Sequence, residues 1–490
     1  MFAVDVCRLP ATGGSTFVVV AGLFLLLAGV IVTRWVRASA GRMSVVVTPL
    51  VLLGGLVLAP SVTDPCGPTT TVVSTTTVAP TTTVVPVDQN LVLEIEKTGL
   101  SPVEIGSVTA ADESFLFELG LFGEVDVHVD WGDGSADDVS AAGPFLHTYT
   151  TLGRYTITVS GSLTGFGQDP LISSDPLLGA SLLKSVRSFG ELGITSLNLA
   201  FYGSANLIDV PSTLPATVTD VHGMFGGASS FDGDVSGWDT GQVTDMGGMF
   251  AGASSFNQSL NSWDTSLVTN MNGMFAGASS FNQNLISWDT SLVMDMSVMF
   301  SEASSFDGDV SGWDTGQVTT MSYMFGGASS FDGDVSGWDT GLVTDMSGMF
   351  AGASSFNQNL NSWDTDLVTN MGFMFYEATS FNQSLDIWDT GLVTDMSGMF
   401  ADASSFNQSL GAWDISAVAS MNNMLVGSGL SGTNYDATLN GWGAEDQVRQ
   451  PNVTLDAGSL QFSRSSRAAR TRLRDPSGSN WTIVDGGVQG

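Results

Sequence analysis

The chain has 490 residues, of which 58 are glycine and only 13% are charged, and its formal net charge at pH 7 is −35. This length allows several modules, and the composition is not that of a disordered chain. No Lys or Arg occurs between Arg187 and Arg449, so this long acidic stretch repels phosphate groups and we expect no nucleic-acid partner. Two cysteines, Cys7 and Cys66, are too few for a disulfide framework or a structural zinc site.

Residues 1–60 contain two apolar runs, each a candidate membrane or signal segment. The first, at 17–33, is long enough to cross a bilayer and is followed by three arginines, and the second covers 45–60. Because arginines stay on the cytoplasmic side, the pattern predicts a helical membrane hairpin with the rest of the chain outside. Alternatively, translation starts at Met43 and the second run is a secretory signal. Both alternatives predict an extracellular location for residues 61–490.

A short motif before the first apolar run, Leu9-Pro10-Ala11-Thr12-Gly13, resembles a sortase wall-sorting signal. Such signals act at the C-terminus, and cleavage after Thr12 would separate only the first residues from the rest. We therefore interpret the motif as a relic of a gene boundary or as part of a simple membrane anchor.

Residues 61–87 are rich in Thr, Val and Pro and lack apolar periodicity. Proline and β-branched residues in such a segment favour an extended conformation. We predict a spacer between the membrane and the body of the protein.

Residues 88–161 show the alternation of apolar and polar residues that is typical of strands. Val125, Val127 and Val129 lead into the turn Asp130-Trp131-Gly132-Asp133-Gly134, and His147-Thr148-Tyr149 follows. The segment resembles a PKD-type domain, which implies an immunoglobulin-like β-sandwich that acts as a spacer or interaction module. The resemblance also implies that His147 and Asp133 form a structural hydrogen bond and not a catalytic pair.

Residues 224–423 repeat a 25-residue unit without slippage. A fixed period of this length is typical of stacked coils, in which each coil buries its apolar side chains against its neighbours. A Met-Phe pair and a Trp-Asp pair recur in every unit, and we expect the tryptophans to have a structural role. These tryptophans are Trp238, Trp263, Trp288, Trp313, Trp338, Trp363, Trp388 and Trp413.

Within one unit the sequence predicts one short strand and one short helix. Phe256 to Trp263 alternates as a strand does, and Val268, Met271 and Phe275 lie at the spacing of one helix face. Asp264 precedes this predicted helix and would cap its first N–H groups. We therefore expect an α/β solenoid.

The unit resembles the BspA-like bacterial surface repeat, a divergent leucine-rich-repeat relative of the DUF285 type. The resemblance implies a right-handed solenoid with a parallel sheet along one side, in secreted or surface-attached proteins of which some are adhesins. Residues 162–223 have solenoid-like spacing without the Trp-Asp pair, so we expect irregular coils and an N-terminal cap there. Residues 424–490 resemble a C-terminal cap, whose arginines we expect to be attracted to the acidic coils.

Stacking turns each repeated position into a column of side chains. We expect Asn257 and its equivalents to form a hydrogen-bonded ladder. Neighbouring aspartates on adjacent coils offer the hard oxygen ligands that Ca²⁺ prefers, although no loop has complete calcium-site spacing. The candidate metal ligands are Asp307, Asp309, Asp332 and Asp334.

No nucleophile, base and orienting acid recur at a recognisable spacing, and the only histidines are His128, His147 and His222. We therefore expect no enzyme, and calcium is the one candidate cofactor. The resemblance favours a surface-anchored protein that mediates adhesion or protein–protein interaction. Two alternatives are a carbohydrate-binding module, in which exposed Trp and Asn columns contact sugars, and a structural surface spacer. The partner would be an extracellular protein or glycan whose identity the sequence does not give.

Overall fold

The computed structural model describes residues 26–27, 30–31, 89–98, 114–169 and 175–489. The chain divides into two units, Met1–Val84 and Val85–Gly490. In the first unit, β1 (Leu26–Leu27) pairs with β2 (Val30–Ile31). The predicted membrane hairpin, the sorting-like motif and the spacer otherwise lie outside the described residues. Within the described ranges, no helix has both the length and the apolar character needed to cross a membrane.

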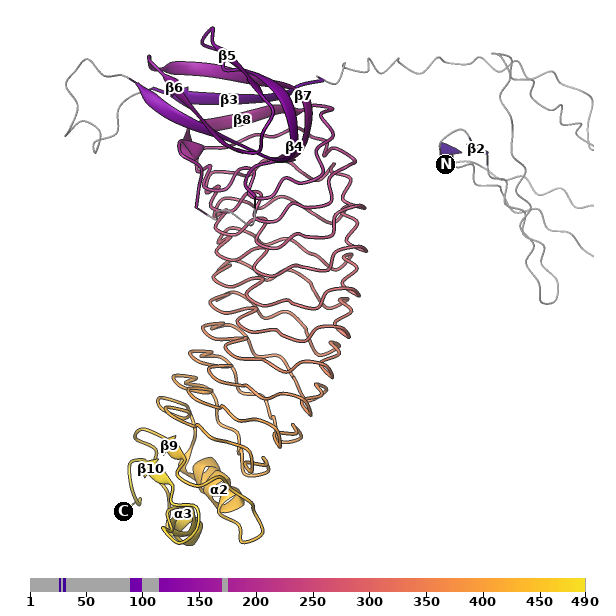
Figure 1. Ribbon diagram of the computed structural model, residues 1–490. Helices are drawn as coiled ribbons and strands as arrows, with labels where there is room; N and C mark the ends of the chain where they lie inside the picture. The colour runs from indigo at the N-terminus through magenta and orange to yellow at the C-terminus, as the bar shows by residue number, and fades with distance from the viewer. Residues whose placement is uncertain (1–25, 28–29, 32–88, 99–113, 170–174, 490) are drawn as a thin grey trace, which may run out of the picture. The chain divides into compact units, whose positions relative to one another are not determined.

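An antiparallel sheet forms the first part of the second unit (Figure 1). Its strands follow the order β5-β4-β7-β3-β8, and β6 also pairs with β4. The strands predicted in this region are therefore confirmed as an antiparallel sheet, whereas the immunoglobulin-like β-sandwich stays a prediction. The strands are β3 (Leu91–Lys97), β4 (Phe115–Asp130), β5 (Ala136–Val139), β6 (Gly143–Tyr149), β7 (Gly153–Phe166) and β8 (Leu183–Phe189), and a 3₁₀ turn, η1 (Ala180–Leu182), precedes β8.

The long strand β4 changes partner along its length. Its first half pairs with β6 and its second half with β5, while β7 pairs with it from Leu121 to Asp130. A register shift lies between Phe122 and Val125, where Gly123 has a φ of 72°. A bulge with a glycine in this conformation bends a strand. The bend places Trp131 and Tyr149, both almost fully buried, in one core.

The sheet continues directly into the coils. β8 lies within the segment predicted as the N-terminal cap and pairs with β3. Ser185 of β8 forms a parallel bridge with Asp209, and Gly165 of β7 forms one with Ser196. The first coils therefore take their backbone pairing from two strands of the sheet.

Each coil from residue 190 to 431 is built of turns and single-residue bridges, and this part of the chain contains no helix and no longer strand. The predicted helix from Val268 to Phe275 and the predicted strand from Phe256 to Trp263 are therefore wrong, and the coils are not an α/β solenoid. The parallel bridges instead pass through Asp245, Asn270, Asp295 and their equivalents.

Hydrogen bonds between coils explain why no helix forms. Gly248 N donates to Asn272 O at 2.8 Å and Gly252 N donates to Ala276 O at 2.6 Å, in each case one coil further on. These alternate N–H groups are committed to the neighbouring coil and cannot bond four residues back, as a helix requires. Gly248 and Gly252 also have φ values of 60° and 70°, outside the helical region.

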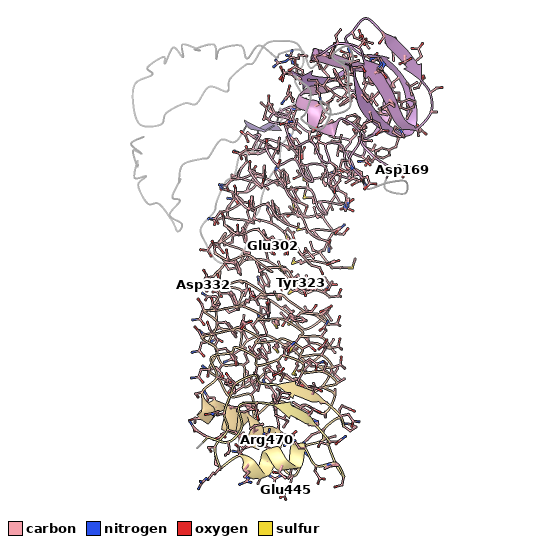
Figure 2. All side chains as sticks on the ribbon, turned by 90° about the vertical axis from the view of Figure 1, so that its left-hand side faces the viewer. Asp169, Glu302, Tyr323, Asp332, Glu445 and Arg470 are labelled. Atoms are coloured by element: carbon pink, nitrogen blue, oxygen red, sulfur yellow. The ribbon has the colours of Figure 1, made fainter. Side chains whose placement is uncertain are left out.

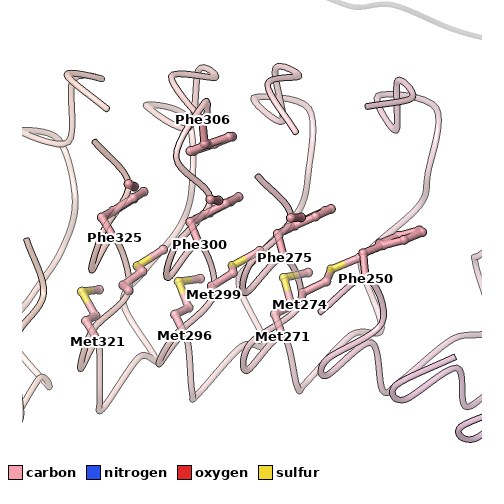
Figure 3. Packing of buried hydrophobic residues seen from close by; sticks show 14 of the residues in the cluster. Phe250, Met271, Met274, Phe275, Met296, Met299, Phe300, Phe306, Met321 and Phe325 are labelled. Carbon is pink, nitrogen blue, oxygen red and sulfur yellow. The ribbon is translucent and has the colours of Figure 1, made fainter. Parts of the chain in front are cut away.

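Buried side chains form continuous columns through the coils (Figure 3). The rings of Phe250 and Phe256 stack within one coil at 3.9 Å, and Phe250 stacks on Phe275 of the next coil at 5.7 Å. Thr265, also buried, donates from Oγ1 to Asp289 O at 2.9 Å. The core is therefore shared between coils, and no coil has a core of its own.

The C-terminal cap contains α2 (Gly432–Trp442), β9 (Thr454–Asp456), α3 (Arg467–Leu473) and β10 (Thr482–Val484). Met421 of the last coil bridges to Leu455 of β9, and β10 pairs with β9 in parallel. The cap thus adds two further rungs to the ladder of coils.

Two of the cap arginines, Arg470 and Arg472, bond within the cap and not to the acidic coils, contrary to the sequence-based expectation. Arg470 Nε lies 2.8 Å from Asp485 Oδ2, whose side chain is 2% exposed. Arg472 donates to Gly443 O and lies 3.6 Å from Glu445. A buried ion pair of this kind needs both partners, because removing one leaves an uncompensated charge.

Candidate functional site

The tryptophan column is internal. The eight repeat tryptophans are at most 4% exposed. Trp263 stacks on Trp288 at 6.5 Å, and its Nε1 donates to Val235 O at 3.0 Å. The hypothesis that exposed tryptophans contact sugars is therefore wrong for this column, because no ring face is open.

The predicted polar ladder is confirmed. Asn257 Oδ1 accepts from Asn282 N at 2.9 Å and from Gln283 Nε2 at 2.9 Å. Where the column holds aspartate the same bond persists, since Asp307 Oδ1 accepts from Asp332 N at 3.0 Å. Only an acceptor oxygen is needed at this position, so Asn and Asp are interchangeable in it.

The four candidate calcium ligands take part in two different hydrogen-bond patterns. Asp307 and Asp332 belong to the polar ladder. Asp309 and Asp334 instead accept from the N–H groups two residues ahead, and the hydrogen bonds from Ser336 lower the pKa of Asp334. In the described part of the chain, no three His, Cys, Asp or Glu side chains are grouped as a metal site would require. Calcium binding stays a prediction.

The aspartate that follows each tryptophan closes a turn and does not cap a helix. Asp264 Oδ1 accepts from Ser266 N at 3.0 Å and from Ser266 Oγ at 2.7 Å. These hydrogen bonds lower the pKa of Asp264. One coil has Asp366 in place of this serine, and the negative charge of Asp364 raises the pKa of Asp366.

A column of exposed leucines was not identified from the sequence. It lies directly before the buried Val268 and its equivalents, and its members are 43–51% exposed. Two coils have Gln242 and Gln317 at the same position. The sequence does show a leucine shortly after the Trp-Asp-Thr motif in these coils. Leucine is usually buried, however, and the sequence alone does not show that the turn directs this side chain outward. The members are Leu267, Leu292, Leu342, Leu367 and Leu392.

A second exposed column departs from the repeat. At the position of Gly248, three coils carry Val298, Tyr323 and Phe373, with φ values of 61°, 52° and 59°. Left-handed backbone is unfavourable for bulky and β-branched residues. Tyr323 and Phe373 are 43% and 42% exposed, so these are surface side chains and not core residues.

In the sheet, the predicted hydrogen bond between His147 and Asp133 is confirmed at 2.9 Å. His147 stacks on Trp131 at 4.5 Å, and Tyr149 donates to Trp131 O at 2.9 Å. Burial acts to raise the pKa of Asp133, but hydrogen bonds from Ser135 and His147 outweigh it and lower that pKa to about 2. Because the hydroxyl of Ser135 donates to the same Asp133, these groups fix the turn.

These observations define a capped repeat protein whose 25-residue coils share buried aromatic columns. The model of the DUF285 family, described as Mycoplasma protein of unknown function, matches residues 195–290, 258–341, 282–366 and 333–442. The matched region runs from 195 to 442, just over half of the chain, so the protein belongs to the DUF285 family. The matched region does not include the sheet formed by β3 to β8. The PKD resemblance therefore stays a prediction. No curated protein and no solved structure matches the chain.

Proposed function

We propose that this chain is an exported, membrane-anchored surface protein that uses its coils for adhesion or protein–protein interaction. In this proposal the coils are a right-handed solenoid of the BspA-like type. The antiparallel sheet is a PKD-like domain that acts as a spacer or as an interaction module. The observation that carries the proposal is the exposed leucine column.

Isolated exposed leucines are common on protein surfaces, whereas a contiguous apolar row is typical of an interaction site. Leu342, Leu367 and Leu392 lie on three successive coils at 43–51% exposure. Each is anchored by a buried neighbour, as Leu342 is by Val343. The backbone of the row is therefore held in place. Little conformational entropy of this surface would be lost when a partner binds.

The charge beside the leucine column suggests the chemistry of a partner. Asp339, Asp364 and Asp389 precede the three leucines by three residues, and no Lys or Arg lies anywhere between Arg187 and Arg449. A protein surface with an apolar strip flanked by Lys or Arg would complement this face. Its association should slow as the salt concentration rises.

The test compares the full chain with the L342Q/L367Q/L392Q variant on an array of purified extracellular proteins. Gln242 and Gln317 occupy the same column, so the variant should fold as the parent does. We expect saturable binding to a basic protein by the parent and its loss in the variant. Equal binding by both chains, or binding by neither, would contradict the proposal. Protease treatment of intact cells tests the location, because external coils would be released.

A structural surface spacer is the second candidate. It is favoured by the polar ladder that runs from Asp232 to Asn407 and ends on Asn434 in α2, which gives the coils a continuous and capped edge. A chain that is released from intact cells by protease but binds no protein would support this alternative.

A further inference from the structure

We infer that three aromatic residues at the surface of the coils, two exposed and one half-buried, form a binding site for neutral glycans. The site, called here the aromatic ridge, consists of Tyr323, Phe373 and Tyr376. It goes beyond the proposed function, because its residues and its ligand chemistry differ from those of the leucine column.

The backbone of the ridge is unfavourable for the side chains that it carries. Gly348 and Gly398 have φ values of 60° and 61° at the same position of neighbouring coils, so the stack imposes this conformation. Tyr323 and Phe373 adopt it with φ values of 52° and 59°. Bulky residues at positive φ are strained, and strain that persists on a surface is a reason to look for function.

Each ring is fixed against the next coil. The ring of Tyr323 fills the space in which a Cβ of Gly348 would stand, and the ring of Phe373 does the same over Gly398. About two fifths of each side chain nevertheless stays open, at 43% and 42% exposure. Since a glycine follows each of these aromatic residues on the next coil, the two rings form flat supports that are fixed against the backbone.

The spacing of the rings suits an extended polymer. Tyr323 and Phe373 are two coils apart, which corresponds to roughly 10 Å at the usual distance between paired strands. Tyr376 extends the surface, with its ring 6.1 Å from Phe373 and nearly perpendicular to it. A linear polysaccharide that lies parallel to the stacking direction could therefore contact the rings of Tyr323 and Phe373 at the same time.

Carboxylates accompany the rings. Three exposed acidic residues occupy the position that Gly252 has in its coil, with φ values of 54–59°. They are Glu302, Glu377 and Asp402. The carboxylate of Glu302 lies over Gly327, and the ring of Tyr323 lies against the adjacent Gly326. Glu302 and Tyr323 are therefore found in the same region of the coils (Figure 2). A hydrogen bond from Tyr376 to Glu377 raises the pKa of Tyr376, and the negative charge of Glu377 adds to this effect.

This combination matches the chemistry of a neutral sugar. The C–H face of a pyranose ring is apolar and slightly positive, and it complements the negative face of an aromatic ring. Sugar hydroxyls donate hydrogen bonds, which carboxylates accept. Glycans with carboxylate or sulfate groups are disfavoured, because the coils contain no Lys or Arg that could pair with them.

A basic peptide is the competing occupant, since cations also bind rings and carboxylates. Such a peptide would find acidic groups along the whole aspartate column, where exposed ion pairs contribute little and are screened by salt. Binding of a basic peptide would not depend on the strained backbone positions that carry Tyr323 and Phe373. The location of the rings therefore favours a ligand that stacks.

The test titrates the full chain with chitohexaose, cellohexaose, laminarihexaose and mannohexaose, with a hyaluronan hexasaccharide and pentalysine as the competing probes. Binding is measured by calorimetry in a detergent without a sugar headgroup. The Y323G/F373G variant removes both rings and gives these coils the glycine that their neighbours have. The V298G variant is its matched control, because it relieves the same backbone strain without removing a ring.

We expect at least one neutral hexasaccharide to bind the parent and V298G alike, with no binding to Y323G/F373G. We also expect the thermal stability of Y323G/F373G to be unchanged or higher, which would show that lost binding is not lost folding. The inference is overturned if no neutral hexasaccharide binds the parent, if binding survives in Y323G/F373G, or if only pentalysine binds. Because the leucine column is intact in both variants, these outcomes are independent of the protein-binding test.

Discussion

The sheet and the coils solve the same problem, the pairing of backbone N–H and C=O groups, in different ways. The sheet uses strands of up to 16 residues, such as β4, whose partners β6 and β7 are tens of residues away in the chain. The coils use single-residue bridges and bonds to the next coil, always at nearly the same separation in sequence. Regular stacking can therefore replace regular secondary structure, provided that every coil has a neighbour on each side.

The two regions also differ in how they tolerate substitution. The buried column of the coils repeats Phe, Met and Trp almost without change, whereas the exposed columns alternate between residue types from coil to coil. The sheet has no repeated unit, so no position in it recurs with a different residue elsewhere in the chain. The coils consequently contain their own controls, from which matched substitutions can be designed.

The largest effect is expected for the F300A substitution in the middle of the coils. Phe300 is fully buried and contacts rings in its own and both neighbouring coils. Large-to-small changes of this kind lower the free energy of unfolding by about 3–5 kcal/mol. Urea unfolding followed by circular dichroism would measure it, with F300L as a control that removes the ring but leaves a smaller cavity than F300A. A loss below about 1 kcal/mol for F300A would contradict the shared core.

In the sheet, acid should act through Asp133. Its pKa is lowered to about 2 in the folded protein, below the usual 3.8. A depressed carboxyl pKa stabilises the folded state fully above the unfolded value, and this contribution is lost as the pH falls through the folded value. The excess thermal stability of the parent over D133N should therefore be present at pH 5 and shrink between about pH 4 and pH 2. An excess that did not change over this range would contradict the assignment.

In the polar ladder, N282A and N282D should behave differently. Asn282 Oδ1 accepts from Asp307 N, and alanine would leave this N–H without its partner. The expected loss for N282A is about 1 kcal/mol of unfolding free energy. The N282D variant keeps an acceptor, as Asp307 and Asp332 do, and should be close to neutral. Equal losses for both variants by urea unfolding would show that the ladder is not held by the acceptor oxygen.

The smallest effect is expected for D366S. The charge of Asp364 raises the pKa of the exposed Asp366, so the ionised form is disfavoured in the folded protein. Stability at this site should therefore increase as the pH falls through the raised pKa. Serine occupies this position as Ser266 and Ser291 and donates to the preceding aspartate. A slightly higher melting temperature for D366S at pH 7, with no gain at pH 3, is the expected result.

The sequence predicted the stacking but not the conformation of a coil. The period of the Trp-Asp pair was sufficient for the first, because only stacked coils bury a column of tryptophans. The spacing of Val268, Met271 and Phe275 also suits a helix, and nothing in one coil shows that its N–H groups bond to the next. Hydrogen bonds between coils decide the backbone, and they are a property of the assembled array.

The candidate sites were predictable to different degrees. The polar ladder followed from repeated Asn and Asp at one position, since any stack brings them together. Leu267 and Tyr323 were not recognised, because their exposure depends on the path of each turn. Tyr323 is conspicuous only when compared with Gly348 in the same column, once the positive φ of that position is known.

The emission of tryptophan in the full chain tests the shared aromatic core most directly. The eleven tryptophans in the described residues are at most 4% exposed. A stacked array predicts a blue-shifted emission maximum and weak quenching by acrylamide, with only the fraction due to Trp35 outside this prediction. A red-shifted spectrum that acrylamide quenches freely would contradict the account, because the tryptophan column would then face the solvent.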